Sequence, residues 1–226
     1  MRYFVPKLVE AEELNSQNRF REKFGGSPFG LPTEKHPLCG QCGKPMSLLV
    51  QLIHDEERLD LGRTGRVLFI FQCSNQRLLS CCAVWEYDSG ANSCFIVESG
   101  ELTSRFEKLP EGRILTEKEF WVAGWETRDD GLSEPEASVF FDEEKYYASD
   151  EELEEIMESL ENITKLGSVP TWVQYMEIPE GDWRFVGQLD DSTGFNFGDA
   201  GIGYIFVENV GDTSRPPKGK FFWQCG

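Results

Sequence analysis

The chain has 226 residues, of which 39% are hydrophobic and 13% aromatic, enough for the core of one large domain or two small ones. It carries 40 acidic against 22 basic residues, so its formal net charge is −18. Such a surface repels nucleic-acid phosphates and anionic lipid, which argues against nucleic acid and membranes as partners. No segment approaches the ~20 apolar residues of a membrane span, and the first 20 residues lack the apolar core of a signal peptide. We therefore expect a cytoplasmic protein that is simply soluble or that has a basic partner.

The N-terminal region leads into the first ordered segment. Residues 1–22 are charged and mildly amphipathic, which predicts a short helix or an extended arm. Residues 23–32, KFGGSPFGLP, are punctuated by glycine and proline and predict an entry loop.

The strongest chemical signal lies between residues 36 and 73. Cys39 and Cys42 form a Cys-Gly-Gln-Cys-Gly knuckle, which is followed by an apolar strand at 46–53, a turn at 62–65 and a second strand at 67–71 that leads to Cys73. Tetrahedral zinc takes soft ligands from separate places in a chain. The glycines let the backbone turn tightly, so that its amides can approach the thiolates. This spacing predicts a structural zinc site.

The fourth zinc ligand is left open between Cys81 and Cys82. Seven cysteines without an export signal favour a metal site and free thiols over disulfides, although buried free thiols are the simpler alternative. His36 could replace one cysteine, but a lone histidine before a proline is expected at the surface. A redox motif is disfavoured because a strand, and not a helix, follows the knuckle. Cys94 and Cys225 are expected to be core or terminal thiols without a role.

The next segments predict further strands. Residues 83–87 and 94–97 flank an Asp-Ser-Gly-Ala-Asn turn and predict a hairpin. Residues 113–125 predict another strand or an edge segment.

The middle of the chain is strongly acidic. Residues 126–163 hold 15 acidic and 2 basic side chains, which is 13 of the 18 net negative charges. Ser149 and Glu152 form a capping-box pattern that predicts a helix start. Apolar residues then recur at helical spacing and predict an acidic amphipathic helix near 150–165 that ends near Gly167: Leu153, Ile156, Met157, Leu160 and Ile163. Its acidic face is expected to be solvated, and the alternative is a surface for a basic client.

The final third, residues 165–226, is rich in predicted strands and offers little catalytic chemistry. The glycine-rich run 198–203 precedes a strand and not a helix, so a tight turn is favoured over a phosphate loop. Asp190 and Asp191 are neighbours on a strand and point to opposite faces, so they do not form a catalytic pair. The many aromatic residues between 172 and 223 are expected mostly in the core.

The two ends of the chain resemble each other. The run at 23–28, KFGGSP, aligns with 165–170, KLGSVP, and the run at 49–52, LVQL, aligns with 186–189, VGQL. The strands at 67–71 and 203–207 also align, and the offsets of 142, 137 and 136 residues drift only slightly. This pattern predicts two similar β modules, of which only the first has the knuckle. Gln51 and Gln188 are expected to bridge equivalent groups in the two copies, because polar residues in apolar strands need partners.

Together these motifs resemble the YwqG-like family of bacterial proteins, which is distantly similar to the eukaryotic programmed cell death protein 2 group. The matching runs are KFGGSP, CGQCGKPMSLLVQL, RVLFIFQC, KLGSVPTWVQ and the closing pair FNFGDAGIGYIFV and FFWQC. The resemblance implies a duplicated antiparallel β fold and a role in protein–protein contact. Eukaryotic relatives act as chaperones for a ribosomal protein, and some such families occur beside toxins. The chain lacks the second cysteine-bearing segment of the eukaryotic relatives, so their client does not carry over.

We therefore predict a mainly β (α+β) protein made of one domain, residues 1–226. Its two antiparallel pseudo-repeats, about 23–98 and 165–226, are joined by an acidic helical segment at 126–164. The predicted function is non-enzymatic protein binding, chaperone-like or toxin-immunity-like, with one structural zinc. The alternative is an enzyme or small-ligand binder that uses the cleft between the two modules.

Overall fold

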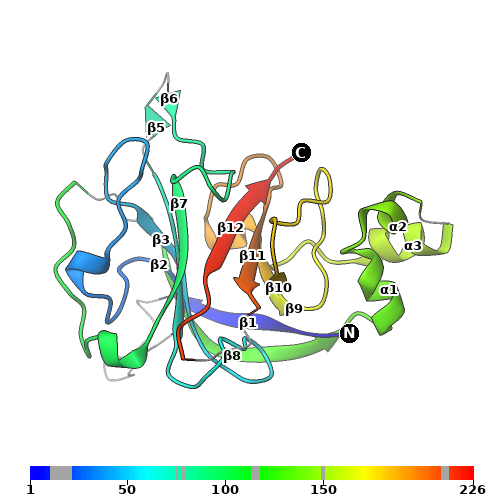
Figure 1. The fold of residues 1–226 in the computed structure, drawn as a ribbon, viewed down its shortest axis with the longest axis horizontal. Coiled ribbons are helices and arrows are strands. Elements are labelled where there is room, and N and C mark those ends of the chain that lie inside the picture. The colour runs from blue at the N-terminus through cyan, green and yellow to red at the C-terminus, as the bar shows by residue number, and fades with distance from the viewer. Residues whose placement is uncertain (11–21, 75, 78–79, 113–117, 149–150, 210–213) are drawn as a thin grey trace.

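The computed structural model describes residues 1–10, 22–74, 76–77, 80–112, 118–148, 151–209 and 214–226. Within them the fold is mainly β, with one ten-stranded antiparallel sheet, a two-stranded ribbon and three α-helices (Figure 1). The helices are α1 (Glu134–Val139), α2 (Glu143–Tyr147) and α3 (Glu151–Ser159). The strands are β1 (Arg2–Glu10), β2 (Lys23–Gly25), β3 (Ser47–Ile53), β4 (Val67–Gln72), β5 (Gln76–Arg77), β6 (Ser80–Cys81), β7 (Asn92–Val97), β8 (Glu119–Asp129), β9 (Lys165–Gly167), β10 (Trp183–Leu189), β11 (Ile202–Glu208) and β12 (Gly219–Gln224).

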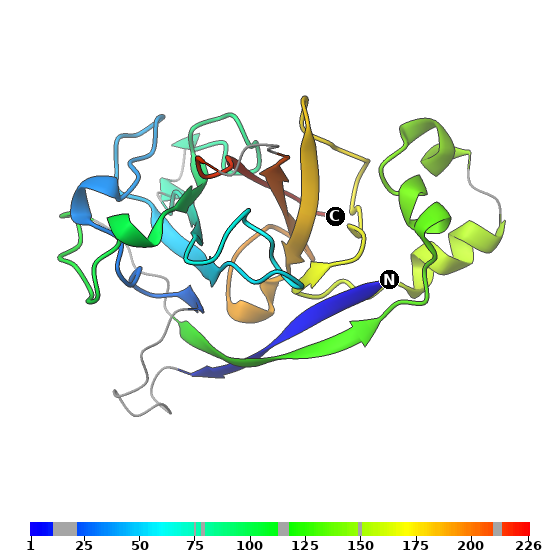
Figure 2. The same cartoon turned by 60° about the horizontal axis from the view of Figure 1, so that its bottom comes forward.

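The large sheet is nearly closed on itself. Its strand order is β12-β11-β10-β9-β1-β8-β2-β3-β4-β7, so the long β1–β8 pair lies in the middle of the order. The two end strands, β7 and β12, meet at an isolated antiparallel bridge between Phe95 and Lys218, and Figure 1 shows them side by side. Figure 2 shows the β1–β8 pair running along one side of the molecule. This closure leaves little exposed strand edge.

Alternation along the strands divides the apolar side chains between two faces. In β4, Leu68 and Ile70 join the central core, whereas Val67, Phe69 and Phe71 join a second cluster on the other face. This is the two-residue period of a strand whose two faces are both covered. The central core takes residues from both ends of the chain, so the two ends share one interior.

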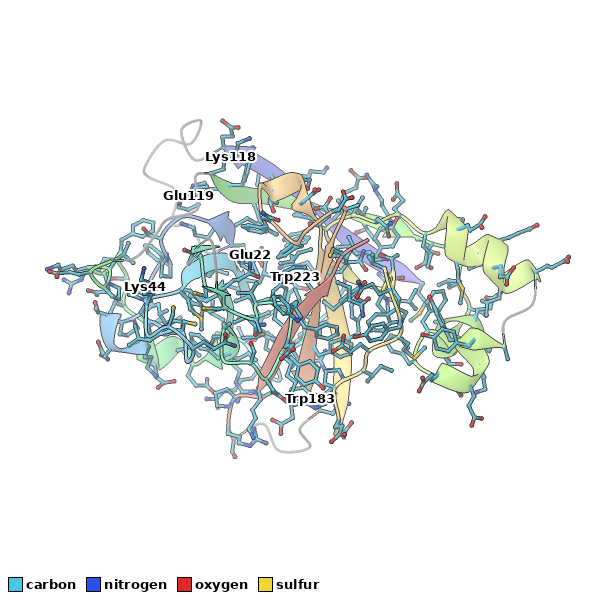
Figure 3. All side chains as sticks on the ribbon, turned by 90° about the horizontal axis from the view of Figure 1, so that it is seen from above. Glu22, Lys44, Lys118, Glu119, Trp183 and Trp223 are labelled. Atoms are coloured by element: carbon cyan, nitrogen blue, oxygen red, sulfur yellow. The ribbon has the colours of Figure 1, made fainter. Side chains whose placement is uncertain are left out.

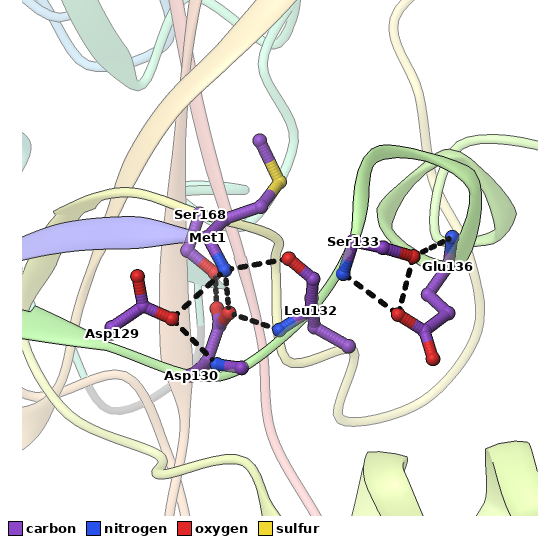
Figure 4. Close-up of polar contacts among 8 residues, drawn as sticks. Met1, Asp129, Asp130, Leu132, Ser133, Glu136 and Ser168 are labelled. Atoms are coloured by element: carbon purple, nitrogen blue, oxygen red, sulfur yellow. Dashed lines mark hydrogen bonds and ion pairs between the residues drawn. The ribbon is translucent and has the colours of Figure 1, made fainter.

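The three helices form a separate lobe at one side of the sheet (Figures 1 and 2). Phe140 and Val169 are buried beneath them, and the apolar side of α3 packs there. Ser133 begins α1 with a capping box, because its hydroxyl accepts the Glu136 N–H while the Glu136 carboxylate accepts the Ser133 N–H (Figure 4). None of the described helices has both the length and the apolar character that a membrane crossing requires.

The turn between β8 and α1 is fixed by polar contacts to β1 and to the residue after β9 (Figure 4). The Met1 amino group donates to the Leu132 carbonyl at 2.9 Å and also contacts the Asp130 carboxylate. Ser168 donates its hydroxyl to the same carboxylate. Burial raises the pKa of Asp130, but these donors outweigh it and hold the pKa below its usual range. The lobe is therefore joined to the middle of the sheet by charge-assisted hydrogen bonds.

Several predicted elements differ from the observed ones. The segment 1–22 contributes a strand within the sheet, β1, and not a helix, while residues 11–21 lie outside the described part. The strand or edge segment predicted at 113–125 corresponds from Glu119 onward to β8, which pairs on both sides and is therefore not an edge. Residues 113–117 of that prediction lie outside the described part. The predicted strand at 83–87 is wrong, because the Asn92 amide donates to the carbonyls of Val84 and Glu86 and holds this stretch as a turn.

The acidic helix is shorter than predicted. Helix α3 ends at Ser159, and the prediction that it continues toward Gly167 is wrong because residues 165–167 pair with β1 and β10 as β9. The predicted cap residue, Ser149, lies outside the described residues. Helices α1 and α2 lie within the acidic helical segment predicted at 126–164, but they were not predicted individually, although Ser133 and Asp142 cap them with side chains typical of helix starts.

A buried lysine lies beneath the lobe. Lys165 is 2% exposed, and its ammonium lies 5.4 Å from the centre of the Tyr3 ring, in a pocket that Asp130 and Glu161 also line. Burial lowers the pKa of Lys165 to about 8, and the two carboxylates only partly oppose this effect.

We expect Lys165→Met to stabilise the protein at neutral pH. An unfolded lysine keeps its proton up to about pH 10.4, whereas folded Lys165 loses it near pH 8. Between the folded and the unfolded pKa the unfolded state therefore binds more protons. Burying the charged lysine lowers the free energy of unfolding by its full amount below pH 8, and this destabilisation fades as the pH rises. The variant should gain roughly 2–3 kcal/mol at pH 7 and less than half of that at pH 9.5, measured by urea unfolding.

Lys23 is the matched control, because it is also fully buried but forms an ion pair with Glu119 and donates to the Ser27 carbonyl at 2.6 Å. Lys23→Met leaves Glu119 without this partner and should lower stability. A Lys165→Met variant that is less stable than wild type at pH 7 would contradict the assignment.

Candidate metal centre

The knuckle is a tight hairpin closed by its own backbone. Cys39 donates its N–H to the Lys44 carbonyl at 2.8 Å, and Gly43 donates to the Cys39 carbonyl at 2.8 Å. Gly43 has φ = +70°, a conformation that glycine adopts without strain. Figure 3 shows Lys44, and with it the knuckle, on the side of the molecule away from the helices.

Two further segments bring sulfur atoms to the knuckle. Cys73 directly follows β4, and its N–H donates to the Ala91 carbonyl at 2.8 Å, which continues the pairing of β4 with β7. Cys82 directly follows β6. The Gln41 side chain fixes the segment after Cys82 to the knuckle, because its Oε1 accepts the Ala83 N–H at 3.0 Å and its Nε2 donates to the Ser89 carbonyl at 3.0 Å.

The four sulfur atoms of Cys39, Cys42, Cys73 and Cys82 all lie within 4.8 Å of one another. The Cys42–Cys73 sulfur distance is 3.6 Å and the Cys73–Cys82 distance is 3.7 Å. A disulfide needs about 2.05 Å, so neither of these pairs is bonded. Tetrahedral zinc with four Zn–S bonds of about 2.3 Å separates its sulfurs by about 3.8 Å. The spacing and the donor type therefore fit a four-coordinate metal ion.

The surroundings of the sulfurs are apolar, with a few directed N–H groups. Cys39, Cys73 and Cys82 are buried among the side chains of the second apolar cluster, and Cys42 is half-buried. Burial raises the pKa of Cys82 to about 11. Burial also opposes ionisation of Cys42, but the Lys44 N–H and the neighbouring thiols together lower its pKa to about 7. A bound divalent cation would offset part of the charge of four thiolates in this setting.

The remaining predicted ligands fall in different places. Cys82 is the fourth member of the group, while the side chain of Cys81 lies outside the described residues. His36 is not exposed as predicted: it is buried, its Nε2 lies 2.8 Å from the Met46 carbonyl oxygen, and its ring meets Phe71 edge-on. Cys94 and Cys225 do not belong to the group, and burial raises the pKa of Cys94.

A nearly closed antiparallel sheet with four clustered cysteines on one outer face defines a β protein with a candidate structural metal centre. A family model described as "Domain of unknown function (DUF1963)" matches residues 22–211, so the chain belongs to this family. YwqG-like proteins carry the same domain. No curated protein matches the chain.

Proposed function

We propose that Cys39, Cys42, Cys73 and Cys82 hold one structural zinc ion. The observation that carries this proposal is the sulfur spacing of 3.6 and 3.7 Å in a cluster of four cysteines. Four protein thiolates fill a tetrahedral shell and leave no position for a substrate, which favours a structural role over a catalytic one. The ion would connect the knuckle, the end of β4 and the segment after β6. Thiolate ligands must stay reduced, so a cytoplasmic location is part of the proposal.

We also infer that the fold arose by duplication. The strands β2-β3-β4-β7 and β9-β10-β11-β12 follow each other in the same sequence order on the two sides of the β1–β8 pair. In both entry strands the last residue and the residue after it have positive φ: Gly25 and Gly26 in the first half, Gly167 and Ser168 in the second. Positive φ is costly for serine, so its presence at the equivalent place supports a common origin.

The two buried glutamines support the same inference. Gln51 accepts the Phe29 N–H at 2.9 Å and donates to the Phe29 carbonyl at 3.1 Å. Gln188 accepts the Thr171 N–H at 3.0 Å and donates to the Thr171 hydroxyl at 2.8 Å. Phe29 and Thr171 are 142 residues apart, which is the offset between the two entry runs. Each glutamine thus fixes the entry loop of its own half.

For the whole molecule we propose non-enzymatic binding of a basic protein through the helical lobe. Residues 126–163 carry 13 net negative charges, and α3 presents exposed glutamates. Phe141, Tyr147 and Tyr175 are exposed beside this acidic surface, and Met176 donates its N–H to the Tyr147 hydroxyl at 3.1 Å. Exposed aromatic side chains are frequent binding anchors, and surrounding charge speeds the approach of an oppositely charged partner.

A YwqG-like assignment within the family fits this proposal and suggests two biological forms of it. In a chaperone-like role the lobe would shield a basic client, and in a toxin-immunity-like role it would block a basic enzyme. The low content of histidine and the closed thiolate centre favour binding over catalysis.

The test is affinity capture from a cell lysate at low salt with matched glutamine variants. Glu154, Glu155 and Glu158 are exposed on α3, and neutralising all three to glutamine should weaken capture of the partner and lower its association rate by about tenfold. The control neutralises three exposed glutamates away from the lobe, Glu34, Glu56 and Glu57, which removes the same charge. Equal loss in both variants, or no specific partner with wild type, would contradict the proposal.

A further inference from the structure

A pocket of about 760 Å³ lies within the N-terminal half of the molecule. Its walls come from the entry loop, from β3 and β4, and from the segments around 64–65 and 99–104. A volume of this size is typical of small-molecule sites. It does not lie between the two halves, where the sequence pattern predicts the alternative ligand site.

The lining is mostly apolar and holds no charged side chain among the described residues. The Gln51 amide has little capacity left for a ligand, because its oxygen accepts the Phe29 N–H and its nitrogen donates to the Phe29 carbonyl. A charged ligand would lose its hydration here without gaining an opposite charge, and the net charge of −18 repels anions in addition. The lining therefore favours an uncharged ligand.

His54 lines the pocket and is its one histidine among the described lining residues. Its side chain is 4% exposed, and its Nδ1 accepts the Leu61 N–H at 2.9 Å. The Asp60 carboxylate lies 3.6 Å from the same nitrogen, whose lone pair is already used. An accepting Nδ1 requires the neutral ring with its hydrogen on Nε2. This Nε2–H has no hydrogen-bond partner in the described part of the chain and is not among its fully buried polar atoms, so it is accessible to a ligand.

We propose that this pocket binds an uncharged, largely apolar small molecule whose carbonyl oxygen accepts the Nε2–H of His54. The apolar walls would bury the body of the ligand, and the fixed tautomer of His54 would orient its carbonyl group. This site is independent of the zinc ion and of the protein partner.

Three probes of matched shape test the proposal in solution: 2-acetylnaphthalene, which has a ketone, 2-ethylnaphthalene, which lacks it, and the anion 2-naphthoate. Binding is measured on the full protein by NMR titration of the backbone amides of Gly30, Gly65 and Thr103. We expect the ketone to bind about tenfold more tightly than the hydrocarbon, as one additional hydrogen bond allows. We expect the anion to bind more weakly than the ketone.

Two variants locate the site and its donor. In His54→Asn the side-chain oxygen can still accept the Leu61 N–H, but the donor to the ligand is withdrawn, so the advantage of the ketone over the hydrocarbon should disappear. Leu102→Trp fills the pocket and should abolish binding of both, whereas Ile178→Trp adds the same ring at an exposed position and should change nothing.

The proposal is overturned if no probe binds, or if the ketone and the hydrocarbon bind equally to wild type. It is also overturned if the anion binds best, if His54→Asn retains the ketone's advantage, or if Leu102→Trp leaves binding intact.

Discussion

Cys82→Ser should release the metal and strongly destabilise the protein. The variant removes one of four sulfurs that lie within 4.8 Å of one another and leaves three thiols without a complete ligand shell. Binding energy at a structural zinc site is folding energy, so we expect a loss of at least about 4 kcal/mol and a drop in Tm of about 10 °C or more. Metal content by mass spectrometry should fall from about one zinc per chain to nearly none, and thermal unfolding gives the Tm.

The adjacent Cys81→Ser is the matched control, because it makes the same chemical change one residue earlier. Cys225→Ser is a second control outside the group. Both should keep the zinc and a Tm close to wild type. A well-folded wild-type protein without metal would show that the cluster is a set of free thiols, and loss of zinc in Cys81→Ser instead would reassign the fourth ligand.

Glu98→Gln should lower stability by about 3 kcal/mol, since it removes a carboxylate charge that is paired with a buried guanidinium. Arg66 is 0% exposed, its Nε donates to Glu98 at 2.8 Å, and its Nη1 donates to the Leu61 carbonyl at 2.8 Å. Arg63 meets the other Glu98 oxygen at 2.8 Å. Glutamine keeps the shape and one acceptor, so the effect comes mainly from the lost charge. Equilibrium urea unfolding at pH 7 measures it.

The same carboxylate predicts a pH dependence. Burial raises the pKa of Glu98, but hydrogen bonds from Arg63 and Arg66 outweigh it, and the pKa lies below its usual range. Its contribution is therefore present above the unfolded pKa and is lost as the pH falls through the lower folded value. The stability difference between wild type and Glu98→Gln should shrink on acidification.

Glu101→Gln is the control for Glu98→Gln. Glu101 pairs with Lys35 at the surface, where an ion pair contributes less than about 1 kcal/mol. If Glu98→Gln and Glu101→Gln lowered stability by the same small amount at pH 7, the prediction would be contradicted, because the Arg66 charge would then be compensated by other groups.

Local patterns in the sequence were sufficient for the chemistry of the knuckle. A Cys-x-x-Cys with glycines needs only a few neighbouring residues to form, so Cys39 and Cys42 could be predicted as candidate ligands, and the strand that follows pointed to Cys73 by its position at the strand end. The structure brings these three sulfurs together with that of Cys82. The choice between Cys81 and Cys82 could not be made in this way, because it depends on how the segment after β6 is fixed by Gln41. No local pattern marks that glutamine.

The sequence by itself determined that the chain is mainly β, where its principal strands lie and which residue types could hold a metal, because period-two alternation and cysteine spacing are local properties. Only the tertiary structure decided that β1 and β8 lie in the middle of one nearly closed sheet, that α3 ends before β9, and that His36 is buried against Phe71. Strand pairing and side-chain burial depend on contacts between residues far apart in the chain. The role proposed for His54 also depends on the tertiary structure. A hydrogen bond from Leu61 fixes its tautomer, and the folding of several segments around it forms the pocket that it lines.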